Sequence, residues 1–161
     1  MYMKTPWMQI KNNKEGAPIV KRTVSFLIGI TTTLLCFTLT TGYGFDPVDL
    51  EKLKTTKICP YCDLTRADLK DADISYANLT HANLSGANLS GANLITAILT
   101  NANLSGAKLQ NSSLGSANLT GANLYGANLT GANLTGADFS GATWTDGTIK
   151  CKEGSIGECK Q

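Results

Sequence analysis

A large apolar residue recurs at every fifth position along most of the second half of the chain. Seventeen consecutive positions obey this spacing: Leu64, Leu69, Ile74, Leu79, Leu84, Leu89, Leu94, Leu99, Leu104, Leu109, Leu114, Leu119, Leu124, Leu129, Leu134, Phe139 and Trp144. The residue two places before each is Ala, apart from Cys62 and Ser112, and the other places are mainly polar or Gly. A period of five fits neither an amphipathic helix nor a strand. The spacing therefore predicts a solenoid of many short, stacked units.

The repeat resembles that of the pentapeptide-repeat family, whose pattern is A-[DN]-L-x-x. Residues 87–91, Ala-Asn-Leu-Ser-Gly, show this pattern without departure. The resemblance implies an all-β solenoid, a right-handed quadrilateral β-helix with four repeats in each coil. Seventeen repeats would then make about four coils. Ala suits the inward neighbour of each large side chain because a narrow interior holds one large group per face.

The segment before the repeat carries the signals of a short helix. Asp46 can be the N-cap and Pro47 the first helical residue, with acidic residues early and Lys residues late. So short a helix is marginal in water by itself. We expect residues 45–58 to form a capping helix and linker on the open first coil, residues 59–146 the β-helix, and residues 147–161 a C-terminal cap.

Residues 1–44 have the succession of an export signal. Residues 24–39 carry no charge, follow a basic stretch and precede small residues. This apolar run is shorter than the roughly 20 residues of a spanning helix. We expect a cleaved signal, with an uncleaved anchor as the alternative, so the membrane is a partner only during export or through that anchor.

Four cysteines remain once Cys36 leaves with the signal, an even number that suits disulfides in an oxidising compartment. In the rod that the resemblance implies, they form two pairs at opposite ends. This separation excludes cross-paired disulfides and a single zinc site built from all four. The expected disulfides join Cys59 to Cys62 and Cys151 to Cys159, the second forming a C-terminal disulfide loop.

Both ends of the repeat resemble exported cyanobacterial members of the same family. Those proteins tend to place C-x-x-C-D-L before the first coil, as in residues 59–64, and end in a tail similar to residues 144–159. The resemblance implies a location in the periplasm or the thylakoid lumen.

Cys59-Pro60-Tyr61-Cys62 also has the letters of a glutaredoxin redox centre. Such a centre needs its first Cys at a helix N-terminus, which stabilises the thiolate. Here the next residues are already in the five-residue register. A thiol-disulfide redox protein using Cys59 and Cys62 is therefore the weaker alternative.

Charge and composition argue against catalysis and nucleic-acid binding. The chain has a net charge of +2, but from Phe45 onward nine Lys and Arg face eleven Asp and Glu, a net charge of −2. His81 is the single histidine and takes an outward position. We expect no enzyme, no catalytic residue, no cofactor, no metal site and no nucleic-acid partner. A cytosolic DNA mimic that binds a topoisomerase, known in this family, would need a more acidic rod and no export.

The expected function is a binding or structural module that presents a rigid surface to an unknown protein partner. With four repeats per coil, Tyr76, Ile95 and Ile98 would form one exposed apolar patch. Neutral variation at tolerant outward positions is the alternative explanation. An open coil end could also form a homo-oligomer.

Overall fold

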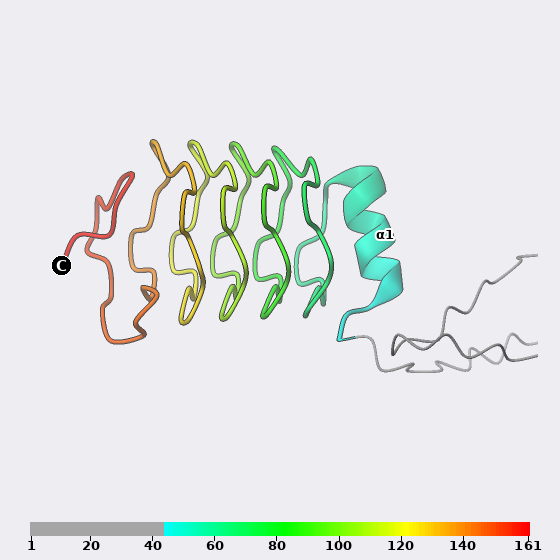
Figure 1. Cartoon of the computed structure of the whole chain (residues 1–161), viewed down its shortest axis with the longest axis horizontal. Helices are drawn as coiled ribbons and strands as arrows, with labels where there is room; N and C mark the ends of the chain where they lie inside the picture. Colours follow the sequence, from blue (N-terminus) through cyan, green and yellow to red (C-terminus); the bar gives the residue numbers. More distant parts are fainter. Residues whose placement is uncertain (1–43) are drawn as a thin grey trace, which may run out of the picture. The chain divides into compact units, whose positions relative to one another are not determined.

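The computed structural model describes residues 44–161, a helix followed by a stack of coils (Figure 1). The predicted export signal lies outside the described residues, apart from Gly44. Within residues 44–161, no helix has both the length and the apolar character needed to cross a bilayer.

The helix α1, Pro47–Thr56, begins where the sequence predicts. The backbone of Asp46 is extended, and its carboxylate accepts the Val48 N–H at 2.8 Å, as an N-cap does. Pro47 follows in the first turn, where a residue needs no N–H because that group would have no partner within the helix. The helix ends at Lys57, which is left-handed (φ 56°) and donates its N–H to the Leu53 carbonyl at 3.0 Å.

The coils are joined by parallel β-bridges between residues twenty positions apart. The bridges run from Ile58 with Asn78 to Asn123 with Thr143, and they step along the chain by five residues. Each coil therefore has four five-residue faces. Because each face is so short, every pairing in residues 44–161 is a single-residue bridge rather than a longer strand.

Every face ends at a corner where one residue has a left-handed backbone. Glycine fills most of these corners in the C-terminal coils, because it adopts a positive φ without strain. At Gly91 (φ 70°), a Cβ would also collide with the carboxylate of Asp71, which leans over it from the preceding coil. At this corner, a side chain and a glycine alternate from coil to coil, as Asp71, Gly91, Asn111 and Gly131.

The apolar residues of the repeat form one continuous core. Those from Leu64 to Leu124 are buried, each with at most 2 % of its surface exposed. Phe139 is also fully buried and makes an edge-on contact with Trp144, with ring centroids 5.2 Å apart. Leu129, Leu134 and Trp144, all in the last coil, are only partly buried.

The first coil is covered by α1. Leu53 is fully buried, and Phe45 and Leu50 pack on the same core. The helix also meets the backbone of the coil at Asp63, whose carbonyl accepts the Asp46 N–H at 2.9 Å. The Asp63 N–H in turn donates to the Asp49 carboxylate at 2.8 Å.

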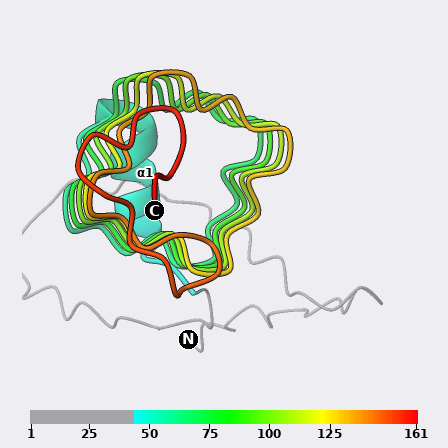
Figure 2. The same ribbon diagram turned by 90° about the vertical axis from the view of Figure 1, so that its left-hand side faces the viewer.

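The last coil is covered by the C-terminal tail, which turns back to form antiparallel bridges. Lys150 pairs with Thr143, and Ile156 pairs with Asp138. Viewed from this end, the red tail crosses one side of the coil and leaves the yellow side uncovered (Figure 2). The bridges of the tail therefore lie on two of the four faces of the last coil.

Candidate protein-binding surface

Three exposed apolar side chains occupy positions where other coils carry small or polar residues. Tyr76 is 71 % exposed, Ile95 39 % and Ile98 41 %. The residues twenty positions away along the stack are Ser75 and Gly115 for Ile95, Asn78 and Asn118 for Ile98, and Thr96 for Tyr76.

The backbone brings these three residues to one corner of the stack. The Tyr76 N–H donates to the Ile95 carbonyl at 2.9 Å, and the Ile98 N–H donates to the Ala77 carbonyl at 2.8 Å. The residues predicted as a patch are thus neighbours in two successive coils. We call them the Tyr76 surface.

The Tyr76 surface continues to the start of the first coil through Ile58, which was expected in the linker. Ile58 is 58 % exposed and bridges Asn78, whose other bridge is to Ile98. Its position was missed because Cys59 stands where the repeat has Leu. The spacing of forty residues between Ile58 and Ile98, two full coils, is the signal that could have found it.

A second aromatic side chain, Tyr61, ends the same face of the first coil. Tyr61 is 75 % exposed and stacks on His81 one coil later, with ring centroids 4.9 Å apart and planes within 5°. His81 is exposed, as its outward repeat position indicates. The stacked rings of Tyr61 and His81 thus add exposed aromatic surface to the face that carries Ile58.

The two tyrosines adopt a backbone conformation that bulky residues rarely take. Tyr61 and Tyr76 both have φ near 60°. A left-handed residue with a Cβ costs about 1–2 kcal/mol relative to its ordinary conformation. Because every corner of the stack has a left-handed residue, this conformation is set by the coil and not by the tyrosines themselves.

An ion pair lies in the first coil beside Tyr76. The Lys57 ammonium is 3.3 Å from the Asp73 carboxylate. The hydroxyl and N–H of Ser75 donate to the same carboxylate at 2.7 and 3.1 Å, and these bonds, with Lys57, lower the pKa of Asp73. Both charged side chains are exposed, so the pair adds little stability.

The four cysteines form the two expected disulfides, with Cα atoms 5.4 Å apart for Cys59–Cys62 and 5.0 Å apart for Cys151–Cys159. The Cys59 and Cys62 sulfurs lie close to the Asp49 carboxylate. While oxidised to each other, they offer no thiolate to a metal ion. Cys59 also follows the C-terminal end of α1, so it lacks the helix N-terminus that a reactive thiolate uses.

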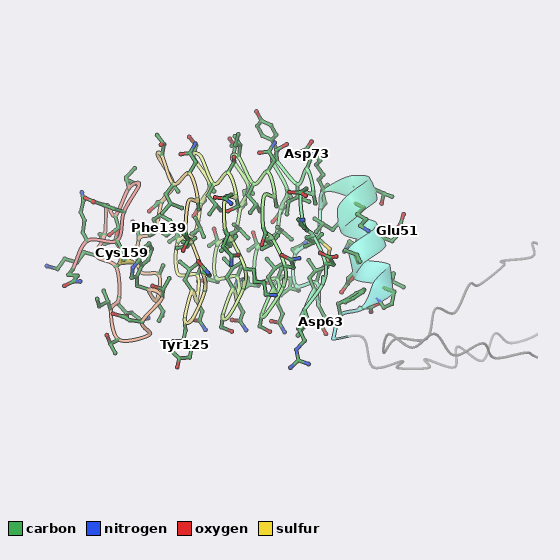
Figure 3. The ribbon with its side chains drawn as sticks, in the orientation of Figure 1. Glu51, Asp63, Asp73, Tyr125, Phe139 and Cys159 are labelled. Atoms are coloured by element: carbon green, nitrogen blue, oxygen red, sulfur yellow. A yellow bond between two sulfur atoms is a disulfide. The ribbon has the colours of Figure 1, made fainter. Side chains whose placement is uncertain are left out.

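A shallow hollow of about 640 Å³ lies by Tyr125, on another side of the stack. Its lining is Asn123, Tyr125, Thr143, Asp146, Gly147 and Thr148. The Thr148 and Ile149 N–H groups hold the Asp146 carboxylate and lower its pKa. Figure 3 places Tyr125 at the edge of the stack opposite Asp73, and thus away from the Tyr76 surface.

Comparison with known proteins accounts for the repeat and the square coil. A family model described as pentapeptide repeats matches eight copies, over residues 62–101 and 102–141. The crystal structure of Rfr23, a pentapeptide repeat protein from the cyanobacterium Cyanothece 51142, is 31 % identical, with 64 % of this chain and 97 % of that one covered and a TM-score of 0.55. The chain belongs to the pentapeptide-repeat family.

A second solved pentapeptide-repeat protein, alr5209 from Nostoc Pcc 7120, is 41 % identical. The alignment covers 57 % of this chain and 78 % of that one, with a TM-score of 0.54. The search of curated proteins gave no significant match. The predicted right-handed quadrilateral β-helix is thus the fold of the family to which this pentapeptide-repeat protein belongs.

Proposed function

We propose that this pentapeptide-repeat protein is a non-enzymatic binding module that presents the Tyr76 surface to a protein partner in an exported compartment, the periplasm or the thylakoid lumen. The observation that carries the proposal is the gathering of Tyr76, Ile95 and Ile98 at one corner, exposed on an otherwise polar repeat. Exposed apolar side chains that adjoin one another typically mark an interaction site.

The backbone beneath these side chains supports this role. The corner is bonded to the coils on both sides, by the Tyr76 N–H toward the next coil and the Asn78 N–H toward Lys57 in the previous one. A surface held in place before binding loses little conformational entropy when the partner docks. Rigid presentation of a few apolar anchors suits protein recognition.

The surface chemistry favours binding over catalysis. The outward positions are mainly Asn, Ser, Thr and Gly. The His81 ring stacks on Tyr61, and no carboxylate among the described residues forms a hydrogen bond that would orient it for catalysis. Of the carboxylates with lowered pKa values, Asp73 and Asp146 are exposed and Asp138 is partly buried, and all three accept local hydrogen bonds. A general base needs the opposite shift, toward neutral pH.

We also assign α1 and the C-terminal disulfide loop the role of caps on a β-helix of about four coils. The burial of Leu53 against the first coil and the tail's bridges to Asp138 and Thr143 support these roles. End coils of a solenoid need such covers to stay soluble and unpaired.

The test of the Tyr76 surface uses residues that the chain itself places at equivalent positions. Tyr76→Gly, Ile95→Thr and Ile98→Asn copy Gly136, Thr135 and Asn118. The triple variant should melt within a few degrees of the native chain and lose the partners that cross-link to a photoreactive residue at position 58. Tyr125→Ser, on another side, is the matched control. Unchanged cross-linking by the triple variant would rule out this surface.

The compartment is tested separately by fractionation, with the N-terminus of the purified protein determined by mass spectrometry. Export predicts a new N-terminus near Phe45 in the periplasmic or lumenal fraction. Uncut protein in the cytosol would overturn the location and favour the DNA-mimic alternative. Binding through the Tyr76 surface could still hold in that case, so the two results are independent.

A further inference from the structure

The backbone edge of each coil normally makes a fixed set of bonds to the next coil. Over the two faces from Ala107 to Ser116, four N–H groups donate to carbonyls of the following coil at 2.8–3.0 Å, and two carbonyls accept from it at 2.9–3.0 Å. The donors are Leu109, Asn111, Leu114 and Ser116; the acceptors are Ala107 and Ser112. The segment that supplies these partners is residues 128–135.

The same six groups one coil later have no partner in residues 44–161. They are the N–H groups of Leu129, Gly131, Leu134 and Gly136 and the carbonyls of Ala127 and Ala132. The side chains behind them, Leu129, Ala132 and Leu134, are only partly buried. This edge, residues 127–136, therefore has an apolar strip and a row of open hydrogen-bonding groups.

On the two adjoining faces of the last coil, the same kind of edge pairs with the extended backbone of the C-terminal tail. The Phe139, Gly141 and Trp144 N–H groups donate at 2.8 Å to tail carbonyls of Ser155, Cys151 and Ile149. The tail reaches the corner at Ala137, whose carbonyl accepts the Gly157 N–H at 2.7 Å. It then turns back, held by the Cys151–Cys159 disulfide, with Gly157 close to the backbone of Leu134 and Gly136, and in the part of the chain that the structure describes it donates no backbone hydrogen bond to residues 127–136 and accepts none from them.

We propose that the open edge formed by residues 127–136 binds an extended segment of a separate polypeptide by strand addition. The segment supplies carbonyls to the four N–H groups and carries a small and a large apolar side chain two positions apart, as the native coils do. The proposal does not depend on the Tyr76 surface, which lies on the side of the stack rather than at its end.

The open edge favours a separate segment over a second copy of the chain. Two identical edges facing each other would each present four donors to only two acceptors, so half of the donors would stay unpaired. The other end of a second copy is covered by α1. A peptide that is extended along each face presents every second carbonyl to the edge, and this spacing matches the donors, which lie two residues apart on each of the two faces.

The experiment measures amide hydrogen exchange by NMR on the full chain, with a synthetic peptide of the sequence of residues 126–135, acetylated and amidated. This sequence occupies the equivalent edge one coil earlier. Saturating peptide should slow exchange at Leu129, Gly131 and Leu134 by about tenfold or more, and leave Leu109 unchanged. No slowing at saturation would overturn the proposal.

Two variants test the mode of binding. A peptide with Pro at both Asn positions lacks the two N–H donors and should give at least tenfold weaker protection. Ala132→Glu, which puts a charge on the apolar strip, should also abolish protection, whereas Thr130→Glu on the outer surface should not; melting curves verify that both fold. Equal protection by the Pro peptide would overturn strand pairing. Protection without peptide that grows with protein concentration would instead identify a second copy as the occupant.

Discussion

The two ends of the coil stack are covered in different ways. At the N-terminal end, α1 buries the apolar residues of the first coil, since Leu64, Leu69 and Ile74 are all at most 2 % exposed. It bonds to the coil backbone at Asp63 and, where the helix runs into the coil, at Ile58. At the C-terminal end, the tail pairs with the backbone of two faces, but Leu129 and Leu134 stay partly open.

This difference shows that the end of a solenoid has two separate needs: its apolar side chains must be buried and its backbone groups must be paired. An exposed end coil presents both apolar side chains and unpaired backbone groups to water. A helix lies across the end and covers side chains, because its own backbone bonds are satisfied internally. An extended tail covers backbone, because it pairs as another coil would, but it covers only the faces along which it runs.

The largest effect is expected from placing a carboxylate at each end. Leu53→Asp buries an unpaired charge beneath α1 and should lower the free energy of unfolding by about 4 kcal/mol or more. Leu134→Asp, at the open edge, should cost less than about 2 kcal/mol because water reaches the new carboxylate. Urea unfolding measures both, with exposed Lys54→Asp as the control. Equal losses would show that the two ends are equally closed.

Loss of the C-terminal disulfide should loosen the tail locally. Cys151 and Cys159 are eight residues apart, and on the chain-entropy model removing such a crosslink costs about 2.5 kcal/mol. In Cys151→Ala/Cys159→Ala, amide exchange should rise at Phe139, Gly141 and Trp144, which pair with the tail. Exchange at Leu64 should stay unchanged. A uniform rise along the stack would mean that the tail supports every coil.

The two ends of the stack also differ at their corners: every corner of the first coil carries a side chain, whereas every corner from Gly121 to Gly141 is Gly. Gly106 (φ 65°) has open space where a Cβ would lie, so Gly106→Ala isolates backbone strain and should cost about 1 kcal/mol. Gly121→Ala should cost more, since Asn101 leans over that position. Thermal unfolding gives both values. If Gly106→Ala leaves the stability unchanged, backbone strain does not explain why Gly occurs at the corners.

Tyr76→Gly makes the reverse change in the first coil and should alter stability by no more than about 0.5 kcal/mol. Relief of the left-handed strain is offset by the greater entropy of the unfolded chain. Cross-linking from position 58 should nevertheless fall if Tyr76 contacts the partner. A large loss of stability instead would assign the ring a structural role.

The smallest effect is expected from pH. Local hydrogen bonds, chiefly from Ser75, Ser140 and Thr148, lower the pKa values of Asp73, Asp138 and Asp146 below the ordinary 3.8. Because the folded pKa values are lowered, their stabilisation is complete above pH 3.8 and is lost as the pH falls through the folded values.

Acid titration of the melting temperature measures this loss. Asp138→Asn should weaken the dependence below pH 3.8 and, at pH 7, lose the small stabilisation that the lowered pKa of Asp138 represents. A native melting temperature that begins to fall well above about pH 4 would point to other groups.

Much of the fold follows from the spacing of the sequence. The five-residue period predicted a solenoid, the resemblance to the pentapeptide-repeat family implied the square coil, and the order of Asp46 and Pro47 predicted the start of α1. The first paired face was missed, because Cys59 stands at the position where the other repeats have a large apolar residue. The extent of C-terminal closure was also not predictable, because it depends on where the tail turns, at Gly157, and no repeat encodes that turn.

For the candidate site, the coil register alone placed Tyr76, Ile95 and Ile98 near one another. It could not indicate how exposed each side chain is, since that depends on which neighbours are small. Gly115, beneath Ile95, is one such neighbour. The stack of Tyr61 on His81 was not predicted, although their twenty-residue separation places them at the same corner of successive coils.

Because the bridges join residues twenty positions apart, the length of the stack depends on the number of twenty-residue coils. Since coils bond only to their neighbours, duplicating twenty residues such as 84–103 should insert one layer and move the helix-covered end away from the open edge by about 4.8 Å. The five-residue period keeps every face in register across such an insertion. Evolution could thus change the distance between two binding surfaces without redesigning either.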